Sequence, residues 1–339
     1  MRTIDWDSKK NNIIMIDQTL LPGDYKIIEC GTIESLCEAI KSLRVRGAPA
    51  LGAAGGFGVA LAAYRSNAST LDALMDELDK AGKNITSTRP TAVNLSWGVK
   101  RVMGVTEDAN NIKEVKMFSL EEAKAIADED VEKNRELGGY GAALLEDGDT
   151  VMTHCNAGRL ACVDWGTALG VIRSAREEGK DIKVIACETR PLNQGSRITA
   201  WELMEDKIPV TLITDSMSGH VMRKGMVDKV IVGADRITQD AVFNKIGTYT
   251  HSVIAKEHGI PFYVAAPVST FDFEHLEDEI EIELRKPDEL KYFGNRQIAP
   301  LDVEVYNPAF DATPMEYVGA VITENGVFYP PFLIDEVRI

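Results

Sequence analysis

The stretch Thr150-Val151-Met152-Thr153-His154-Cys155-Asn156-Ala157-Gly158 decides the fold class of this 339-residue chain. It opens with a short apolar and β-branched run, typical of a buried strand, and polar and small residues follow at once. Similar runs come later, and helical stretches separate most of them. Strands that alternate with helices at this spacing predict a parallel α/β sheet covered on both faces. The expected strands are Thr150–His154, Lys183–Cys187, Val210–Ile213, Lys229–Val232 and Phe262–Ala265.

Polar or glycine-rich residues follow each of these expected strands. In open α/β sheets, ligands bind beyond the carboxyl ends of the strands, so these residues should converge on one edge of the sheet. The helices expected around the strands are Leu160–Glu178, Arg197–Glu205, Gly219–Lys224 and Thr250–Glu257.

The first part of the chain mixes short strand-like pieces with helical periodicity. Ser119 then begins Ser-Leu-Glu-Glu, a capping-box spacing that predicts a long helix ending near Leu137. We expect a smaller, mostly helical N-terminal α+β domain over residues 1–117, a connecting helix over 118–140 and a Rossmann-like catalytic domain over 141–339. The helices expected in the first part are Ile33–Leu43, Ala48–Tyr64, Leu71–Gly82 and Ala92–Met103.

Charge and composition argue against several classes of function. The formal net charge is −16, and nucleic-acid or membrane-surface binding would need a basic face. No apolar run approaches the ~18 residues of a membrane span, and the start of the chain does not resemble a signal peptide. These features predict a cytoplasmic protein in which an anionic substrate needs locally concentrated arginines.

The five cysteines are odd in number and widely scattered, and no two of them form a CxxC pair. We interpret Cys30, Cys37 and Cys187 as reduced, mostly buried thiols of a cytosolic protein. This spacing predicts no metal site. The sequence has no GxGxxG after a strand and no Walker pattern, so a nucleotide site is not expected.

Two arginines precede expected helices in the first part of the chain. Arg46, Gly47 and Ala48 lead into a glycine-rich segment whose backbone N–H groups can face an anion, and Arg46 adds a bidentate donor. Arg89 stands directly before Pro90 and a helix, and is a candidate second phosphate ligand. The structural alternatives are close packing of the small residues and a plain surface position for Arg89.

Cys155 follows a buried strand and precedes Asn-Ala-Gly and an expected helix. A thiol at a helix N-terminus faces the positive end of the macrodipole, which favours the thiolate. A purely structural cysteine is the alternative. His154 should point to the opposite side of the extended segment, so we do not expect a Cys–His dyad.

Asp235, in Gly-Ala-Asp-Arg, ends another expected strand and is a candidate general acid or base if an apolar pocket raises its pKa. A salt bridge to Arg236 or a helix cap is the alternative. Gln194, Asn244 and Lys245 lie in polar clusters after expected strands, where they are compatible with hydroxyl or phosphate binding.

Together and in this order, the motifs are specific. The chain resembles the methylthioribose-1-phosphate isomerase family over nearly its whole length, a family related to ribose-1,5-bisphosphate isomerases and to regulatory subunits of a translation initiation exchange factor. The resemblance implies a homodimer that needs no metal or nucleotide cofactor. The motifs that carry it are Ile16-Asp17-Gln18-Thr19-Leu20-Leu21-Pro22, RGAPALG, TRPTAVNL, THCNAG, GTALGVIR, ETRPLNQGSR, VGADRI, NKIGTY and NPAFDATP.

The resemblance also implies roles for individual residues. It makes Asp235 the proton donor and Cys155 the group that supports the transition state. The reaction implied is conversion of 5-methylthioribose 1-phosphate, a pentose 1-phosphate, into 5-methylthioribulose 1-phosphate in methionine salvage. The residues implied to contact substrate are Arg46, Gly47, Ala48, Arg89, Gln194, Asn244 and Lys245.

One departure from the family pattern bears on the substrate. Arg159 and Trp165 stand where the family usually has small residues. They either pack against the N-terminal domain or reshape the pocket around the 5-position of the sugar. In the second case the substrate is another pentose 1-phosphate, such as 5-deoxyribose 1-phosphate or ribose 1,5-bisphosphate. A non-catalytic regulatory subunit is a further alternative, which the presence of both Cys155 and Asp235 disfavours.

Overall fold

The computed structural model describes residues 2–90 and 92–338, and the chain divides into two compact units. Unit 1 comprises Met1–Glu136 and Ala157–Gly170, and unit 2 comprises Leu137–Asn156 and Val171–Ile339. The segment directly after Asn156 therefore belongs to unit 1, although the residues on both sides of it belong to unit 2. Within the described ranges, no helix has the length and apolar character that crossing a membrane requires.

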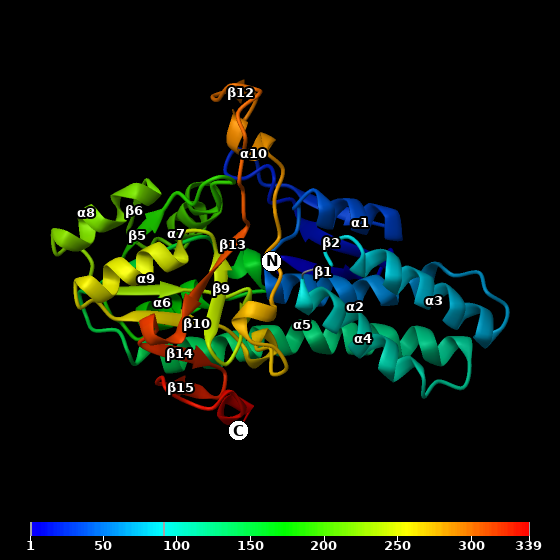
Figure 1. The fold of residues 1–339 in the computed structure, drawn as a ribbon. Coiled ribbons are helices and arrows are strands. Elements are labelled where there is room, and N and C mark those ends of the chain that lie inside the picture. The colour runs from blue at the N-terminus through cyan, green and yellow to red at the C-terminus, as the bar shows by residue number, and fades with distance from the viewer. Residues whose placement is uncertain (1, 91, 339) are drawn as a thin grey trace. The chain divides into compact units, whose positions relative to one another are not determined.

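Unit 1 combines a small antiparallel sheet with a helical bundle (Figure 1). Strand β2 lies between β1 and β3, and helix α2 packs against α1, α3 and α4. These elements enclose one apolar core, in which Phe57 and Leu61 of α2 are fully buried. The elements are β1 (Ile4–Asp7), β2 (Asn12–Ile16), β3 (Ile27–Cys30), α1 (Ile33–Lys41), α2 (Ala48–Arg65), α3 (Leu71–Thr86) and α4 (Val93–Thr106).

Local sequence explains how these helices begin. The Thr32 side chain accepts a hydrogen bond from the Ser35 backbone N–H and caps α1, as Thr70 caps α3 through Ala73. Helix α2 begins instead at Gly47, whose φ of 94° is open to glycine at little cost, and Pro49 fits its first turn. Helix α2 is rich in Ala and Gly, and these small residues let neighbouring helices approach closely. Most of this helix is therefore buried.

The long helix α5 spans Ile112–Ala142, so the expected start at Ser119 and end near Leu137 were wrong. The side chain of Asn111 accepts the Glu114 backbone N–H, which caps the helix about two turns earlier than the capping-box motif suggested. Ser119 is fully buried inside the helix, and its hydroxyl donates to the Lys116 carbonyl. Leu137 and Ala142 are fully buried, and their packing stabilises the helix across Gly138, Gly139 and Gly141.

Unit 2 is built on a seven-stranded sheet within the described residues, in the order β15-β14-β10-β7-β4-β5-β6. All neighbouring pairs are parallel except β14 with β15. The expected parallel α/β sheet is confirmed. Its strands are β4 (Thr150–Thr153), β5 (Lys183–Cys187), β6 (Val210–Ile213), β7 (Lys229–Val232), β10 (Phe262–Ala265), β14 (Ala320–Thr323) and β15 (Gly326–Phe328).

The strand order places a topological switch point between β4 and β7. From β4 the chain builds outward to β5 and β6 on one side, and later to β7, β10 and β14 on the other. Open α/β sheets bind ligands at the carboxyl ends of the strands that flank such a point. The residues after β4 and β7 are therefore placed by topology to meet a ligand.

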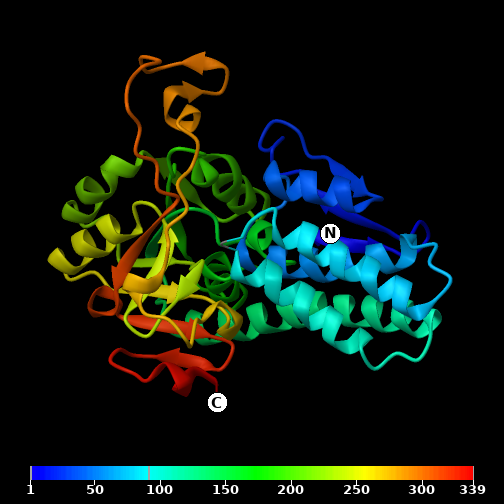
Figure 2. The same ribbon diagram turned by 45° about the vertical axis from the view of Figure 1, so that its right-hand side comes forward.

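Helices and two smaller β structures complete unit 2. The strands β8 (Arg236–Ile237), β9 (Ala241–Lys245) and β13 (Phe310–Pro314) form an antiparallel sheet in the order β13-β9-β8. The hairpin of β11 (Tyr292–Phe293) and β12 (Arg296–Gln297), preceded by α10 (Asp288–Lys291), extends away from the large sheet (Figures 1 and 2). The remaining helices are α6 (Ala168–Glu177), α7 (Ala200–Glu205), α8 (Ser218–Arg223) and α9 (Thr248–Glu257).

Replacing Gly47 by Ala should destabilise unit 1, because an added Cβ would lie 2.3 Å from the Ala161 carbonyl oxygen and because φ is 94°. We expect the free energy of unfolding to fall by roughly 2 kcal/mol or more, measured by urea unfolding. Gly148 is the matched control, since its φ is 90° but nothing lies within 4 Å of an added Cβ. Equal losses in both variants would show that the close approach at Gly47 has no energetic role.

Candidate active site

Cys155 lies directly beyond β4 and is half-buried, with a left-handed backbone at φ 63°. The expected helix over Leu160–Glu178 was wrong in its first part. The chain forms only a short 3₁₀ turn at Arg159–Ala161, and the regular helix α6 begins at Ala168. Cys155 is therefore not at the N-terminus of the expected helix, and the macrodipole of that helix does not explain a reactive thiol.

Two buried threonines hold the backbone of Cys155. The Cys155 N–H donates to Thr189 Oγ1 at 2.8 Å, and Thr199 Oγ1 donates to the Cys155 carbonyl at 2.6 Å. Both threonines are fully buried, and Thr189 itself has φ 66°, which is unusual for a β-branched residue. Left-handed backbone at two non-glycine residues in contact costs roughly 1–3 kcal/mol each, and such strain collects at functional sites.

A buried ionic network contacts Asn156, the residue directly after Cys155. Asn156 Nδ2 donates to Thr199 Oγ1 at 3.2 Å and to Glu202 Oε1 at 2.9 Å. The other oxygen of Glu202 accepts from Arg173 at 2.8 Å, and Arg173 also pairs with Asp206. Arg173 and Glu202 are almost completely buried, so each charge depends on the other. Sequence reasoning missed this network, because its members come from three separate segments.

Asp235 lies beyond β7 and is half-buried, and its backbone N–H donates to the Phe243 carbonyl at 2.8 Å. Arg236, the expected salt-bridge partner of Asp235, pairs with Asp272 at 2.9 Å. Since β4 and β7 are adjacent parallel strands, Cys155 and Asp235 follow the two strands at the switch point.

Gln194 and its neighbour Asn193 offer acceptors that the protein leaves unused. Gln194 is 7% exposed, and the side-chain oxygens of both residues are buried with no hydrogen-bond partner in the described structure. Asn193 has φ 57°, and a π-helical turn begins at Gly195. Gly195 approaches the Cys187 carbonyl so closely that an added Cβ would lie 1.6 Å from its oxygen. Buried, unsatisfied amide oxygens favour a ligand that carries hydroxyl groups.

Asn244 and Lys245 lie within strand β9, not after a strand as expected. Both are buried; Asn244 donates to Thr248 Oγ1 at 3.0 Å, and Lys245 Nζ donates to the Ala309 carbonyl at 2.7 Å. Asp311 of β13 accepts the Gly247 N–H at 2.7 Å and the Tyr249 N–H at 3.2 Å, capping α9. Burial raises the pKa of Asp311 to about 6.

The remaining predicted substrate residues lie in unit 1. Arg46, Gly47 and Ala48 are half-buried and form the entry to α2, where backbone N–H groups at a helix N-terminus are suited to an anion. Arg89 is half-buried and precedes α4 by four residues. Unit 1 thus carries the predicted arginines, and unit 2 carries the predicted acid, thiol and amides.

His154 does not serve Cys155 as a base, as expected from the sequence. Its Nε2 donates to the Ile246 carbonyl at 2.9 Å, and its Nδ1 lies 3.2 Å from Nε2 of His251. Burial lowers the pKa of His154 to about 4 and that of His251 to about 3, so both rings are neutral at neutral pH. Sequence patterns gave no indication of His251.

Trp165 packs within unit 1, with the Arg135 guanidinium 4.0 Å from the centre of its ring. Its φ of 65°, followed by 88° at Gly166, explains why no helix runs through this segment. The carboxylate of Asp130 accepts the Val163 N–H at 2.6 Å and anchors the same segment to α5. This packing favours the structural interpretation of Trp165.

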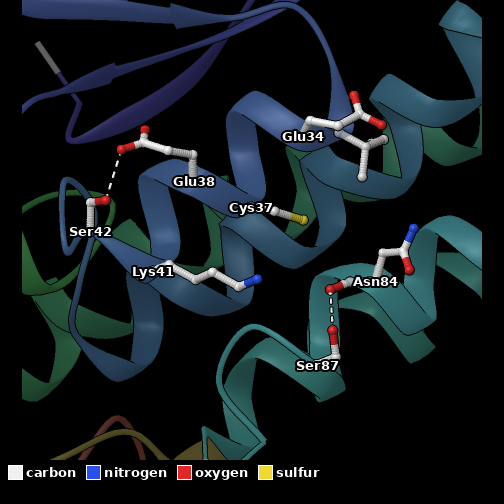
Figure 3. A pocket seen from close by; sticks show the side chains of 8 residues that line it. Glu34, Cys37, Glu38, Lys41, Ser42, Asn84 and Ser87 are labelled. Carbon is white, nitrogen blue, oxygen red and sulfur yellow. Dashed lines mark hydrogen bonds between the residues drawn. The ribbon is translucent and has the colours of Figure 1, made fainter.

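A pocket of about 500 Å³ lies elsewhere in unit 1, between α1 and α3 (Figure 3). Its lining mixes both signs of charge, with Glu34, Glu38 and Lys41 beside the half-buried Cys37. It contains none of the predicted site residues, and we assign no ligand to it.

Comparison with known proteins places the chain in a family. Residues 44–330 match the model described as the Initiation factor 2 subunit family, so the chain belongs to that family. It is 51% identical over 322 residues to the methylthioribose-1-phosphate isomerase of Acetivibrio thermocellus, covering 94% of each chain.

Two solved structures are similar over almost the whole chain. The 5-methylthioribose 1-phosphate isomerase of Pyrococcus horikoshii matches with a TM-score of 0.91 and 46% identity, covering 98% of this chain and 93% of that one. A structure described as translation initiation factor eIF-2B, subunit delta, from A. fulgidus matches with a TM-score of 0.90 and 61% identity, covering 99% of both.

Replacing Glu202 by Gln should destabilise the protein, because it leaves the buried Arg173 charge partly uncompensated. We expect a loss of roughly 2–4 kcal/mol in the free energy of unfolding, measured by urea unfolding. The same change at Glu205, an exposed residue of the same helix, is the control and should alter stability by less than about 0.5 kcal/mol. Similar losses at both positions would contradict a role for the network.

The raised pKa of Asp311 predicts a defined pH dependence. Between about pH 4 and 6 the unfolded chain loses this proton before the folded chain does, so its contribution to stability falls as pH rises. The stability of the native chain minus that of Asp311→Asn should therefore decrease by up to about 2–3 kcal/mol over this range and stay level above pH 7. A difference that increases with pH would refute the raised pKa.

Proposed function

We propose that the chain is an aldose–ketose isomerase that converts 5-methylthio-D-ribose 1-phosphate to 5-methylthio-D-ribulose 1-phosphate. The observation that carries this proposal is the position of Cys155 and Asp235 after the two parallel strands at the switch point. The names of the related proteins from A. thermocellus and P. horikoshii support the same reaction. In that reaction the chain contributes to methionine salvage.

The chemistry assigns a distinct task to each residue. The anomeric carbon of an aldose 1-phosphate is locked as a phosphate ester, so the ring opens only if its oxygen receives a proton. Asp235, in its protonated form, donates that proton. One hydrogen then moves from C2 to C1, and the 2-hydroxyl gives up its proton as its oxygen becomes the ketone oxygen, which replaces the proton that Asp235 donated. The hydrogen moves either through an enediol, with Cys155 as the base that takes a proton from C2, which is then returned to C1, or as a hydride, with Cys155 stabilising the developing charge. Both routes end at the same ketose.

In this proposal the remaining predicted residues bind the substrate. Arg46, Arg89 and Lys245 neutralise the phosphate, which offsets repulsion from a chain with a net charge of −16. The N–H groups at Gly47 and Ala48 add donors for the same anion. The Gln194 oxygen, which has no partner in the described structure, accepts a sugar hydroxyl, and Asn244 completes the polar contacts. No metal or nucleotide takes part in this scheme.

The chain also acts, in this proposal, as a cytoplasmic homodimer. The segment 276–306 supports an interface, because it exposes many apolar side chains that an isolated chain leaves in water. Multi-angle light scattering of the purified chain tests the dimer, and a monomer at micromolar concentration would overturn it. The exposed side chains include Leu284, Phe293, Ile298, Leu301 and Tyr306.

Cys155→Ser and Asp235→Asn should each lower kcat by roughly 10²-fold or more while leaving the fold intact. Ketose formation followed by NMR measures the rate, and circular dichroism checks the fold. Cys37→Ser and Asp288→Asn, which lie outside the site, are the matched controls and should keep normal turnover. A Cys155 or Asp235 variant with near-normal kcat would refute its assigned role.

A panel of pentose 1-phosphates that differ only at C5 tests the substrate. The methylthio sugar should have the highest kcat/KM, above 5-deoxyribose 1-phosphate and ribose 1,5-bisphosphate. The A. fulgidus structure described as a translation initiation factor favours one competing function, a regulatory subunit. Tight association with a translation factor and no turnover of any sugar in the panel would decide for that function.

A further inference from the structure

Three potential metal ligands converge in the interior of unit 2. His154 follows β4, Cys187 ends β5 and His251 lies on α9. One ligand atom from each lies within 4.8 Å of the other two, and all three side chains are at most 1% exposed. Two imidazoles and a thiol are the donor set that zinc and other borderline-soft metals prefer, whereas magnesium and calcium prefer oxygen.

The two histidines already have the spacing of a metal site. His154 Nε2 donates to the Ile246 carbonyl at 2.9 Å, so its Nδ1 presents a lone pair towards His251. Such an outer hydrogen bond fixes the ring of a metal-binding histidine. His154 Nδ1 and His251 Nε2 are 3.2 Å apart. In a tetrahedral site with metal–nitrogen bonds of about 2.0–2.1 Å, the two nitrogens lie about 3.4 Å apart.

Asp215 lies next to these three ligands but outside the group whose ligand atoms all lie within 4.8 Å of one another, and we assign it the fourth position. Its Oδ1 lies 3.8 Å from His154 Nδ1, close to the spacing of two ligands on one ion. Its two oxygens accept the backbone N–H groups of Thr189 and Arg190, each at 2.7 Å, and these bonds fix the carboxylate. The Asp215 carboxylate and a Cys187 thiolate carry two negative charges, and the two imidazoles are neutral. A divalent ion therefore gives the site a net charge of zero, which a buried environment tolerates.

Hydrogen bonds within the described residues leave some polar groups of this cluster without a partner. If His251 Nε2 donates to His154, then Nδ1 of His251 is a buried lone pair, and it has no hydrogen-bond partner among the described residues. None of the hydrogen bonds of the described residues involves the sulfur of Cys187, so this thiol is a second group of the cluster without a polar partner. An ion bound by His154 Nδ1, His251 Nε2 and the Cys187 sulfur gives the thiol a polar partner and leaves Nδ1 of His251 as a buried N–H.

We propose that His154, Cys187, His251 and Asp215 bind one borderline-soft divalent metal ion, zinc fitting best, as a structural site. The ion joins the ends of β4 and β5 to α9 and so rigidifies the backbone that precedes Cys155. Four protein ligands leave no open position for substrate, so the ion has no part in isomerisation. This proposal does not depend on the proposed function.

Metal binding to the full-length chain tests the site. The chain is stripped with a chelator, and zinc or cobalt(II) is added as the probe. We expect one tightly bound zinc per chain by equilibrium dialysis, a higher melting temperature, and a cobalt form with the intense visible bands of tetrahedral geometry and a thiolate-to-cobalt charge-transfer band. Absence of stoichiometric zinc binding would overturn the proposal.

Variants identify the ligands without relying on activity. Cys187→Ser should abolish the charge-transfer band, and His251→Gln should weaken zinc binding at least tenfold. Cys155→Ser and Cys30→Ser are the controls and should retain the band, because neither thiol belongs to the site. A band that persists in Cys187→Ser, or disappears in Cys155→Ser, would contradict the assignment.

X-ray absorption on the zinc-loaded native chain gives an answer even if a variant does not fold. One sulfur and three nitrogen or oxygen neighbours are expected, and a shell of oxygen alone would refute the site. Because all of these measurements observe the metal and not the sugar, loss of the isomerase proposal would leave them unaffected.

Discussion

The parallel pairing of β4 with β7 is the constraint on which the rest of unit 2 depends. β4 is hydrogen-bonded to β5 on one side and to β7 on the other, so the chain continues from β4 towards β5 and from β7 towards β10, in opposite directions along the sheet. The connections therefore diverge at the carboxyl ends of these two strands and leave room for a ligand there. Cys155 and Asp235 take their importance from this position, because neither is distinctive as an isolated residue.

The backbone at Cys155 is strained, and contacts from several segments of unit 2 keep it in this conformation. Cys155 and Thr189 both adopt left-handed backbone, which the chain alone disfavours. The hydrogen bonds from the threonines, and the buried Arg173–Glu202 pair behind them, supply the opposing stabilisation. The geometry of the site is therefore determined by contacts made from distant segments.

The sequence predicted the parts of this structure that depend on local patterns. Short apolar runs such as Lys229–Val232 predicted the parallel strands, because a strand buried on both faces must be apolar throughout. Patterns failed where a distant contact prevails over local preference. Ser119 has the spacing of a capping box but is buried inside α5, and the segment 157–167 has helical periodicity but is held in an irregular form by its packing in unit 1.

Although it did not predict β14 and β15, the sequence by itself determined the α/β class, five of the seven strands of the large sheet and the candidate residues Cys155 and Asp235. These follow from periodicity and from short motifs, which act over a few residues. Only the tertiary structure decided which strands are neighbours, that Arg236 pairs with Asp272, and that His154, Cys187 and His251 meet. The physical reason is that these contacts join residues tens of positions apart, and no local preference encodes which distant partner a buried group will find.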